Sequence, residues 1–409
     1  MNKFLKEFKD RGFFYQCTNE NELSKLLDRE KICSYIGFDC TAESLHVGSL
    51  LQIMCLRLLQ KHGHRPIVLL GGGTTRIGDP SGKDKTRTIL SEDEIEKNIK
   101  NIEKILKNFL DNKDPKTKPI FVNNHSWLKG LNYISFLRDI GKHFTINKML
   151  SFDSVKTRLE REQSLSYMEF NYMILQAYDF LELSQKENCV LQMGGSDQWG
   201  NIVNGVELIK RYSNKQAYGL TTPLITLASG AKMGKTVSGA VWLDKKILSP
   251  YNYWQFWRNT DDRDVLKFIK IFTDLSDDKI DVIKKQDINQ QKIILANEAT
   301  SLLHGKKAAS ASEETAKKTF SENSLGAELP SLLISKSQLD KGLNVVDLIF
   351  LSKLESSKSE IRRLIKGNGV KINNQSIIDE KLIIRKKIFK NNNIKLSLGK
   401  KRHIKVELS

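Results

Sequence analysis

The sequence predicts an α/β protein whose N-terminal part is built on a parallel sheet, followed by a small all-α domain and a C-terminal α+β domain. Residues 34–60 and 189–209 each begin as a short buried strand, pass through a polar turn and continue as an apolar helix. A further buried strand at 65–70 ends in a glycine-rich loop. Strands and helices that alternate in this way are typical of a parallel sheet that binds ligands at the carboxyl ends of its strands.

The 409 residues are enough for two or three domains. Residues 1–33 have helical spacing and are expected only to pack against the sheet, and Ser91–Glu94 is a capping box that should begin another helix. The expected segments are a sheet domain at 1–225, a mobile loop and connection at 226–248, a helical domain at 249–304, a linker with short helices at 305–342, and a last domain at 343–409.

The first polar turn has the features of a phosphate site. Ser44 is expected as the N-cap of a helix that begins near His46. His46, Gly48 and the first backbone N–H groups then lie at the carboxyl edge of a strand, where the helix dipole favours an anion and the glycine permits its close approach. The alternative is a βα unit with an incidental surface histidine, because HxGx alone is a weak motif.

The loop after the strand at 65–70 contains Asp79 and then the cations Lys83 and Arg87. It is not GxGxxG, since Arg76 occupies the third glycine position, and GDPSGK lacks the Walker spacing. Loops in this position often line a ligand crevice. We therefore expect it to bring a carboxylate and positive charge to a site.

Residues 167–183 form an apolar helix with an ordered set of polar exceptions. Tyr172, Gln176 and Asp179 are spaced i, i+4 and i+7, which places them on one helical face. Buried carboxylates and amides need partners, so this face meets either a ligand or a structural polar network. The turn after the strand at 189–193 adds Asp197 and Gln198 at the same edge of the sheet as His46.

A glycine-flanked loop at 229–236 carries Lys232, Lys235 and Thr236. Gly230 is one residue short of the P-loop spacing, and no strand-to-helix unit frames the motif. We interpret it as a mobile loop that presents lysines to phosphate.

Positive charge is concentrated near the C-terminus. Of the net charge of +18, +10 lies in 343–409, which has 16 Lys and Arg against six Asp and Glu. A helix at 357–365 should expose Lys358, Arg362, Arg363 and Lys366. This imbalance favours a nucleic-acid partner over a merely solvated helix.

Other classes of protein are disfavoured. No apolar run approaches the roughly 20 residues of a membrane span, and the first ten residues lack the apolar core of a secretory signal, so we expect a cytoplasmic protein. The five cysteines are scattered without CxxC spacing, which argues against zinc and against a disulfide framework, and no metal site is expected.

Taken together, these motifs resemble the bacterial-type tyrosyl-tRNA synthetases, which are class I aminoacyl-tRNA synthetases. The segments that carry the resemblance are YIGFDCTAESLHVG at 35–48, GDPSGK at 78–83, YMILQAYDF at 172–180, GGSDQWGN at 194–201 and KMGKT at 232–236. The basic C-terminal module is similar to an RNA-binding domain shared with a small-subunit ribosomal protein. The resemblance implies a Rossmann-like catalytic domain and a two-step reaction: tyrosine and ATP give tyrosyl-adenylate and pyrophosphate, and the tyrosyl group then passes to tRNA.

The resemblance also implies a role for each matching residue. Tyr35 and Asp179 would bind the phenol of the substrate, and Asp79, Tyr172 and Gln176 its ammonium group. The adenylate and the reacting carboxyl region would be held by Asp39, Gly48, Ser49, Gly195, Asp197, Gln198 and Lys235. The triphosphate would be stabilised during reaction by Thr41, His46, Lys83, Arg87, Lys232, Lys235 and Thr236. Cations, hydroxyls and an imidazole suit this chemistry, because attack of a carboxylate on a phosphate needs alignment and positive charge rather than an enzymic nucleophile.

The implied partners are tRNA(Tyr), L-tyrosine and ATP, with Mg²⁺ accompanying ATP and no tightly bound cofactor. The resemblance also implies a homodimer, formed through apolar helices around Phe136 to Ile146 and the following segment. Two positions depart from the family pattern: Ser49 replaces the usual histidine or asparagine, and Gly234 replaces the serine of the wider class. The alternatives are a tryptophan-specific relative, which would not need Tyr35 and Asp179 for a hydroxyl, a nucleotidyltransferase, and an RNA-binding accessory protein that has lost catalysis.

Overall fold

The computed structural model describes residues 1–79, 90–231, 233–236, 239–320, 326–399 and 402–409. The chain forms two compact units, one of residues 1–248 and 256–304 and one of residues 249–255 and 305–409.

The first unit contains the predicted parallel sheet. Its strand order is β1-β6-β5-β2-β3-β4. The parallel strands are β2 (Cys33–Phe38), β3 (Arg65–Leu70), β4 (Ile120–Asn123), β5 (Cys189–Gly195) and β6 (Tyr218–Thr222), and β1 (Gln16–Cys17) pairs antiparallel with β6. The order reverses between β2 and β5, because β3 and β4 extend the sheet on one side and β6 on the other. A reversal of this kind opens a crevice at the carboxyl ends of the strands.

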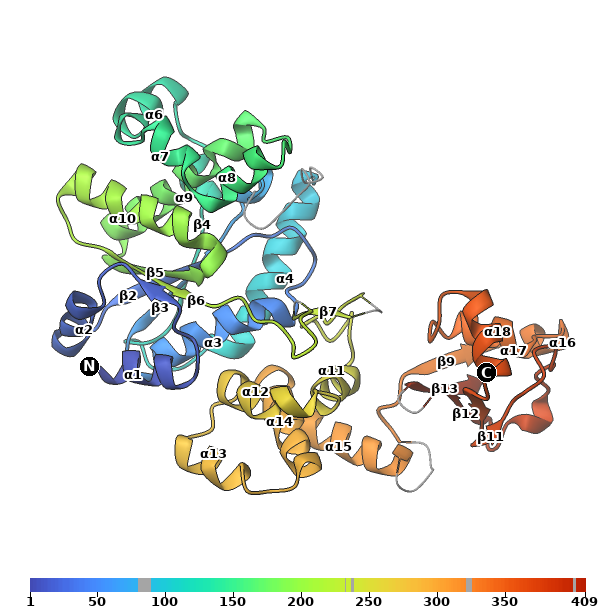
Figure 1. The fold of residues 1–409 in the computed structure, drawn as a ribbon. Coiled ribbons are helices and arrows are strands. Elements are labelled where there is room, and N and C mark those ends of the chain that lie inside the picture. Colours follow the sequence, from blue (N-terminus) through green and yellow to red (C-terminus); the bar gives the residue numbers. More distant parts are fainter. Residues whose placement is uncertain (80–89, 232, 237–238, 321–325, 400–401) are drawn as a thin grey trace. The chain divides into compact units, whose positions relative to one another are not determined.

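Helices cover both faces of this sheet (Figure 1). α9 (Tyr167–Lys186) and α10 (Trp199–Ser213) lie on one face, and α3 (Val47–Lys61), with α1 (Lys3–Asp10) and α4 (Glu92–Leu110) beside it, lies on the other. Apolar residues of the strands and of α9, among them Ile67, Leu69, Met173 and Phe180, form one buried core. The predicted capping box at Ser91 and Glu94 is present.

The expectation that Ser44 caps α3 is wrong. The N-cap is His46, whose backbone is extended and whose Nδ1 accepts a hydrogen bond of 3.0 Å from Gly48 N. The Ser44 hydroxyl instead donates to Leu45 O and accepts from Asp244 N. The chain therefore enters the helix two residues later than a serine cap would require.

The remaining elements complete the first unit. The helices are α2 (Glu20–Arg29), α5 (His125–Leu128), α6 (Tyr133–Asp139), α7 (Ile146–Leu150), α8 (Asp153–Glu160), α12 (Val265–Phe272), α13 (Asp277–Ile283) and α14 (Ile288–His304). A small hairpin is formed by β7 (Lys235–Thr236) and β8 (Gly239–Ala240), and the 3-10 turns are η1 (Thr74–Arg76), η2 (Gly141–His143), η3 (Ser196–Gln198) and η4 (Asp262–Asp264).

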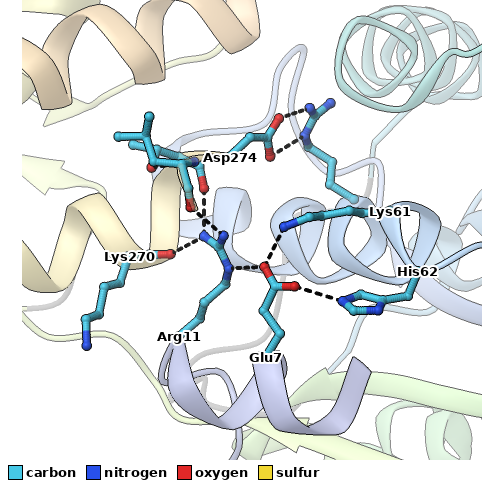
Figure 2. Close-up of polar contacts among 9 residues, drawn as sticks. Glu7, Arg11, Lys61, His62, Lys270 and Asp274 are labelled. Atoms are coloured by element: carbon cyan, nitrogen blue, oxygen red, sulfur yellow. Dashed lines mark hydrogen bonds and ion pairs between the residues drawn. The ribbon is translucent and has the colours of Figure 1, made fainter. Parts of the chain in front are cut away.

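The N-terminal helix fixes α12 to the sheet domain through a polar cluster (Figure 2). The buried guanidinium of Arg11 donates to the carbonyls of Lys270, Thr273 and Leu275 at the end of α12, with distances of 2.8 to 2.9 Å. Its Nε donates to Glu7, which also accepts from Lys61 and His62 at the end of α3. Residues 1–33 therefore pack as expected, and they also connect α3 with α12.

The second unit is an α+β domain. Its sheet has the order β11-β10-β12-β13-β9. The elements in chain order are α15 (Lys306–Phe320), β9 (Ser331–Ile334), α16 (Lys336–Asp340), α17 (Val345–Leu351), α18 (Lys358–Lys366), β10 (Val370–Ile372), β11 (Gln375–Ser376), η5 (Lys386–Ile388), β12 (Asn393–Leu398) and β13 (Arg402–Leu408); α11 (Pro250–Arg258) has residues in both units. The strand β9 pairs parallel with β13, so the stretch predicted as a linker contributes an edge strand.

Candidate active site

A cavity of about 470 Å³ lies where the strand order reverses, at the carboxyl ends of β2 and β5. Strand ends, the N-terminus of α3 and one face of α9 line it. The structure brings together here twelve of the residues that the sequence predicted for a site: Tyr35, Asp39, His46, Gly48, Ser49, Asp79, Tyr172, Gln176, Asp179, Gly195, Asp197 and Gln198.

One end of the cavity contains the buried carboxylate of Asp179. It accepts hydrogen bonds from Asn124 Nδ2 at 2.9 Å and from Trp127 Nε1 at 2.7 Å. Burial raises the pKa of Asp179 to about 7, although these two hydrogen bonds favour the ionised form and lower it. Two hydrogen bonds leave part of the acceptor capacity of an ionised carboxylate unused, so Asp179 can accept another from a neutral donor in the cavity.

Tyr35 lies in the same wall, from the middle of β2. Its side chain is 1% exposed, and its hydroxyl has no hydrogen-bond partner within the described parts of the chain. Burial, and secondarily the negative charge of Asp179, hold the pKa of Tyr35 well above its usual value, so it remains a neutral donor. A buried hydroxyl without a partner normally costs free energy, which indicates that a ligand completes this part of the site.

The other end of the cavity combines carboxylates with phenol and amide groups. Tyr172 Oη donates to Asp39 at 3.1 Å, and Gln198 Nε2 donates to Asp79 at 2.9 Å. Asn201 donates to both Gln176 and Gln198 at 3.0 Å. Negative charge with several acceptor oxygens suits an ammonium group and hydroxyls.

A chain of hydrogen bonds along the cavity wall joins Asp179 to Asp39. Asn124 Nδ2 donates both to Asp179 and to Thr74 Oγ1, and the Thr74 hydroxyl donates to Asp39 at 3.0 Å. Asn124 Oδ1 also accepts from Gly73 N at 2.7 Å. The orientation of Asp179 is thereby linked to that of Asp39 through buried side chains.

The N-terminus of α3 forms the rim of the cavity together with the loop that contains the KMGKT motif. Val47 N donates to Val241 O at 2.9 Å, and His46 forms an antiparallel bridge with Trp242. Gly234 has φ +98°, and a Cβ there would lie 2.9 Å from Gly48 N. A side chain at position 234 would therefore require both a strained backbone and a displacement of the loop from the start of α3.

The remaining predicted residues are not among those lining the cavity. Thr41 is exposed beside it. Lys83, Arg87 and Lys232 lie outside the described residues, and Lys235 and Thr236 are described only as the backbone of β7. The roles predicted for these five residues at the phosphates therefore stay predictions.

Asn124, Trp127, Thr74 and Asn201 are cavity-supporting residues that the sequence analysis did not identify. Asn124 follows β4 directly, as the predicted residues follow β2 and β5, so the same strand-end signal was available there. It was missed because β4 has only four residues, three of them apolar, which is too short a run to predict a strand.

The described residues contain no group of three or more His, Cys, Asp or Glu side chains arranged to hold a metal ion, and no helix among them combines the length and apolar character of a membrane span.

The predicted basic helix is α18, in the second unit. Lys358 pairs with Asp347 at 2.7 Å and Arg363 with Glu360 at 3.0 Å, and Lys366 lies 3.9 Å from Glu380. The exposed cations of α18 are thus close to carboxylates.

Comparisons with known proteins agree with this architecture. The family model of class I tRNA synthetases (W and Y) matches residues 27–321. Tyrosine–tRNA ligase of Pelagibacter ubique (strain HTCC1062) is 80% identical over 408 residues, covering 100% of both chains, and that of Wolbachia sp. subsp. Brugia malayi (strain TRS) is 54% identical over 413 residues, covering 100% of this chain and 99% of the relative.

A solved structure, a C-terminally truncated mitochondrial tyrosyl-tRNA synthetase of Aspergillus nidulans, superposes with a TM-score of 0.71 at 31% identity over 78% of this chain and 94% of that one. The fold, the crevice at the strand reversal and the family match define a class I aminoacyl-tRNA synthetase of the tryptophan and tyrosine group. Within that group, the chain belongs to the tyrosine–tRNA ligase family.

Proposed function

We infer that the chain activates L-tyrosine with ATP and transfers the tyrosyl group to tRNA(Tyr). In the first step the tyrosine carboxylate attacks the α-phosphorus of ATP, and the bond to pyrophosphate breaks. In the second step the terminal ribose hydroxyl of tRNA attacks the acyl carbon, and AMP leaves.

The choice of tyrosine as substrate rests on two residues of the cavity, Tyr35 and Asp179. The hydroxyl of Tyr35 has no partner in the described chain, and Asp179 keeps acceptor capacity beside it. The phenol hydroxyl of a tyrosine substrate can accept a hydrogen bond from Tyr35 and donate one to Asp179. An indole N–H only donates, so a tryptophan substrate would leave Tyr35 unsatisfied.

We assign the ammonium group of tyrosine to the acceptor-rich end of the cavity. Asp79, Tyr172 and Gln176 lie there, and hydrogen bonds to Gln198, Asp39 and Asn201 hold them in place. Asp39, Gly195, Asp197 and Gln198 are assigned to the adenylate, because they line the same cavity as His46 and Gly48 at the N-terminus of α3.

We assign the phosphates to the N-terminus of α3. The dipole of a 15-residue helix favours an anion there, with His46 and Gly48 at its start. Lys83, Arg87, Lys232 and Lys235 are proposed to stabilise the departing pyrophosphate, with Mg²⁺ bound to ATP itself, and Thr41, Ser49 and Thr236 to assist. Their contribution is to charge stabilisation in the transition state.

A homodimer is proposed, formed through an apolar surface of the first unit. Exposed apolar side chains gather on α6 to α9, where Ile134 is 70% and Tyr167 66% exposed. Other members of this surface are Tyr133, Leu137, Ile146, Leu150, Leu159 and Met168. Exposed apolar side chains that recur on consecutive helices often mark a protein interface. The cytoplasm is the proposed location.

The test of substrate choice is amino-acid-dependent ATP–pyrophosphate exchange with tyrosine, tryptophan and phenylalanine in parallel. We expect exchange with tyrosine alone at comparable concentrations. Exchange with tryptophan at an equal rate would contradict the assignment, and absence of exchange with all three would contradict the activity.

A further inference from the structure

The positive charge of the C-terminal region is unevenly distributed within it. Residues 343–380, which include α18, contain six Lys and Arg against five Asp and Glu. Residues 381–409 contain ten Lys and Arg against one acidic residue, Glu407. Nearly all of the excess charge that favours RNA binding therefore follows α18 in the sequence.

Several cations of this last stretch are engaged within the protein. Lys395 is buried and donates to Thr319 O at 2.6 Å. Arg402 pairs with Glu355 at 3.2 Å, and Lys405 pairs with Glu407.

The 381–390 segment differs from the rest of the domain. It contains Lys381, Arg385, Lys386, Lys387 and Lys390, all exposed, and no acidic residue. Across the described ranges of the chain, none of these five side chains takes part in an ion pair, whereas three of the four cations of α18 do. Their charge is therefore available to a polyanion without breaking an existing pair.

The backbone of the 381–390 segment is held in place. Val345 N donates to Leu382 O at 2.9 Å, and Ile384 N donates to Leu343 O at 2.8 Å. Asn373 Nδ2 donates to Ile388 O at 2.9 Å, and Ile384 is fully buried in the core of the domain. Apolar side chains thus anchor the segment while the cations remain in solvent, so little backbone entropy is lost when a ligand binds.

We propose that the 381–390 segment is the main surface of this domain that contacts RNA phosphates. The inference rests on the proposed charging of tRNA and names the side chains that bind its backbone. Guanidinium and ammonium groups bind phosphate oxygens through charge-assisted hydrogen bonds and release condensed counterions. Such contacts carry no base information, so they set affinity and register on the folded RNA.

Three full-length variants with the same loss of charge test the proposal. The segment variant is Arg385→Gln with Lys386→Gln and Lys387→Gln. The helix variant is Arg362→Gln with Arg363→Gln and Lys366→Gln. The control variant is Lys336→Gln with Lys341→Gln and Lys353→Gln, which removes three exposed lysines of the same domain. The Kd for a tRNA(Tyr) transcript is measured from 50 to 300 mM salt, and thermal unfolding checks that each variant is folded.

We expect the segment variant to lower the slope of log Kd against log salt by about 3, about one for each lost phosphate contact, and to weaken binding at least tenfold at the lowest salt. The helix and control variants should each change the slope by less than about 1. Equal slopes for the segment and control variants, or a larger loss in the helix variant, would overturn the proposal.

ATP–pyrophosphate exchange needs no RNA and separates two kinds of failure. Suppose that the wild type catalyses ATP–pyrophosphate exchange and binds tRNA, but the segment variant binds tRNA as the control variant does. That result would contradict only this inference. A wild-type chain that neither exchanges nor binds tRNA contradicts the proposed function itself.

Discussion

The side-chain amide of Asn124 donates a hydrogen bond of 2.9 Å to the buried carboxylate of Asp179. Asn124 comes from the end of β4 and Asp179 from α9, so the contact joins the edge of the sheet to the helix that covers it. Burial raises the pKa of the carboxyl to about 7, and the hydrogen bonds from Asn124 and Trp127 oppose that rise. Asn124 therefore helps to set the pH at which the proposed phenol acceptor is ionised.

The first prediction concerns the pH dependence of tyrosine binding. A phenol O–H stabilises the ionised form of Asp179, so tyrosine affinity should increase as the pH rises through about 7, with release of a proton on binding below that pH. Asn124→Ala removes a hydrogen bond that lowers the pKa, and its midpoint should lie at higher pH. Calorimetry in two buffers with different ionisation enthalpies measures the proton release; an unchanged midpoint in Asn124→Ala would contradict the assignment.

The second prediction separates binding from stability at Tyr35. Its hydroxyl is buried without a partner among the described residues, so Tyr35→Phe should raise the free energy of unfolding of the ligand-free protein by about 1 kcal/mol. The same variant should lose about tenfold in selectivity for tyrosine over phenylalanine, which corresponds to about one hydrogen bond. Exchange kinetics with both amino acids measure the ratio, and retention of wild-type selectivity would remove Tyr35 from the phenol site.

The third prediction compares two glycines of the KMGKT region. Gly230 and Gly234 both have positive φ, of +81° and +98°, but only at Gly234 would a Cβ meet other atoms, at 2.9 Å from Gly48 N. Alanine at either position should strain the backbone, and alanine at Gly234 should also push the loop away from the N-terminus of α3. We expect Gly234→Ala to slow adenylate formation much more than Gly230→Ala, with tyrosine affinity nearly unchanged in both. Single-turnover kinetics measure this, and equal rates in the two variants would exclude a role for the close contact.

The fourth prediction concerns stability in acid. Burial alone would raise the pKa of Glu7, but hydrogen bonds from Lys61, His62 and Arg11 outweigh it and lower the pKa to about 2 (Figure 2). A carboxylate with a depressed pKa contributes stability above its unfolded value of 4.5, and that contribution is lost as the pH falls through about 2. Denaturant unfolding of Glu7→Gln should therefore show lower stability than the wild type at pH 7 and a flatter pH dependence between about 5 and 2.

The matched control for this experiment is Glu22→Gln, because Glu22 forms an exposed pair with Lys25 on α2. Exposed pairs of this kind contribute little to stability. A Glu22→Gln variant that flattens the pH dependence as much as Glu7→Gln would show that the effect is one of general charge rather than of the cluster.

The positions of His46, Tyr172 and Asp179 could be predicted because their signals are local. A polar turn after a buried strand and a polar face on an apolar helix are visible within about 15 residues of sequence. Asn124 also follows a strand end, but its hydrogen-bond partners and those of Thr74 could not be predicted from local sequence. Their roles depend on β3 and β4 being neighbours and on α9 crossing above them, which is a property of the sheet order.

The charge of the last domain could also be predicted only in part from the sequence. The net charge of the last domain follows from counting residues, and composition alone is enough to indicate a polyanionic partner. Which cations are neutralised could not be counted, because Lys358 and Lys366 meet Asp347 and Glu380 through folding of the chain. The helix α18 is basic in sequence, but within the described ranges fewer of its cations are unpaired than in the 381–390 segment.

The last prediction is that adenylate formation and tRNA charging can be separated by removing the C-terminal sheet. The described residues that line the cavity all belong to the first unit, between Tyr35 and Phe272. A chain that ends at Phe320 keeps this unit and α15, and it removes all strands of the second sheet together, including β9, so no edge strand is left unpaired. The truncated chain should exchange pyrophosphate at close to the wild-type rate, because tyrosine and ATP meet within the first unit. It should charge tRNA poorly and with a weaker dependence on salt, because the excess positive charge has been removed. Aminoacylation at the wild-type rate across a salt titration, by a truncated chain with an intact unfolding transition, would show that the C-terminal charge has no part in binding the RNA substrate.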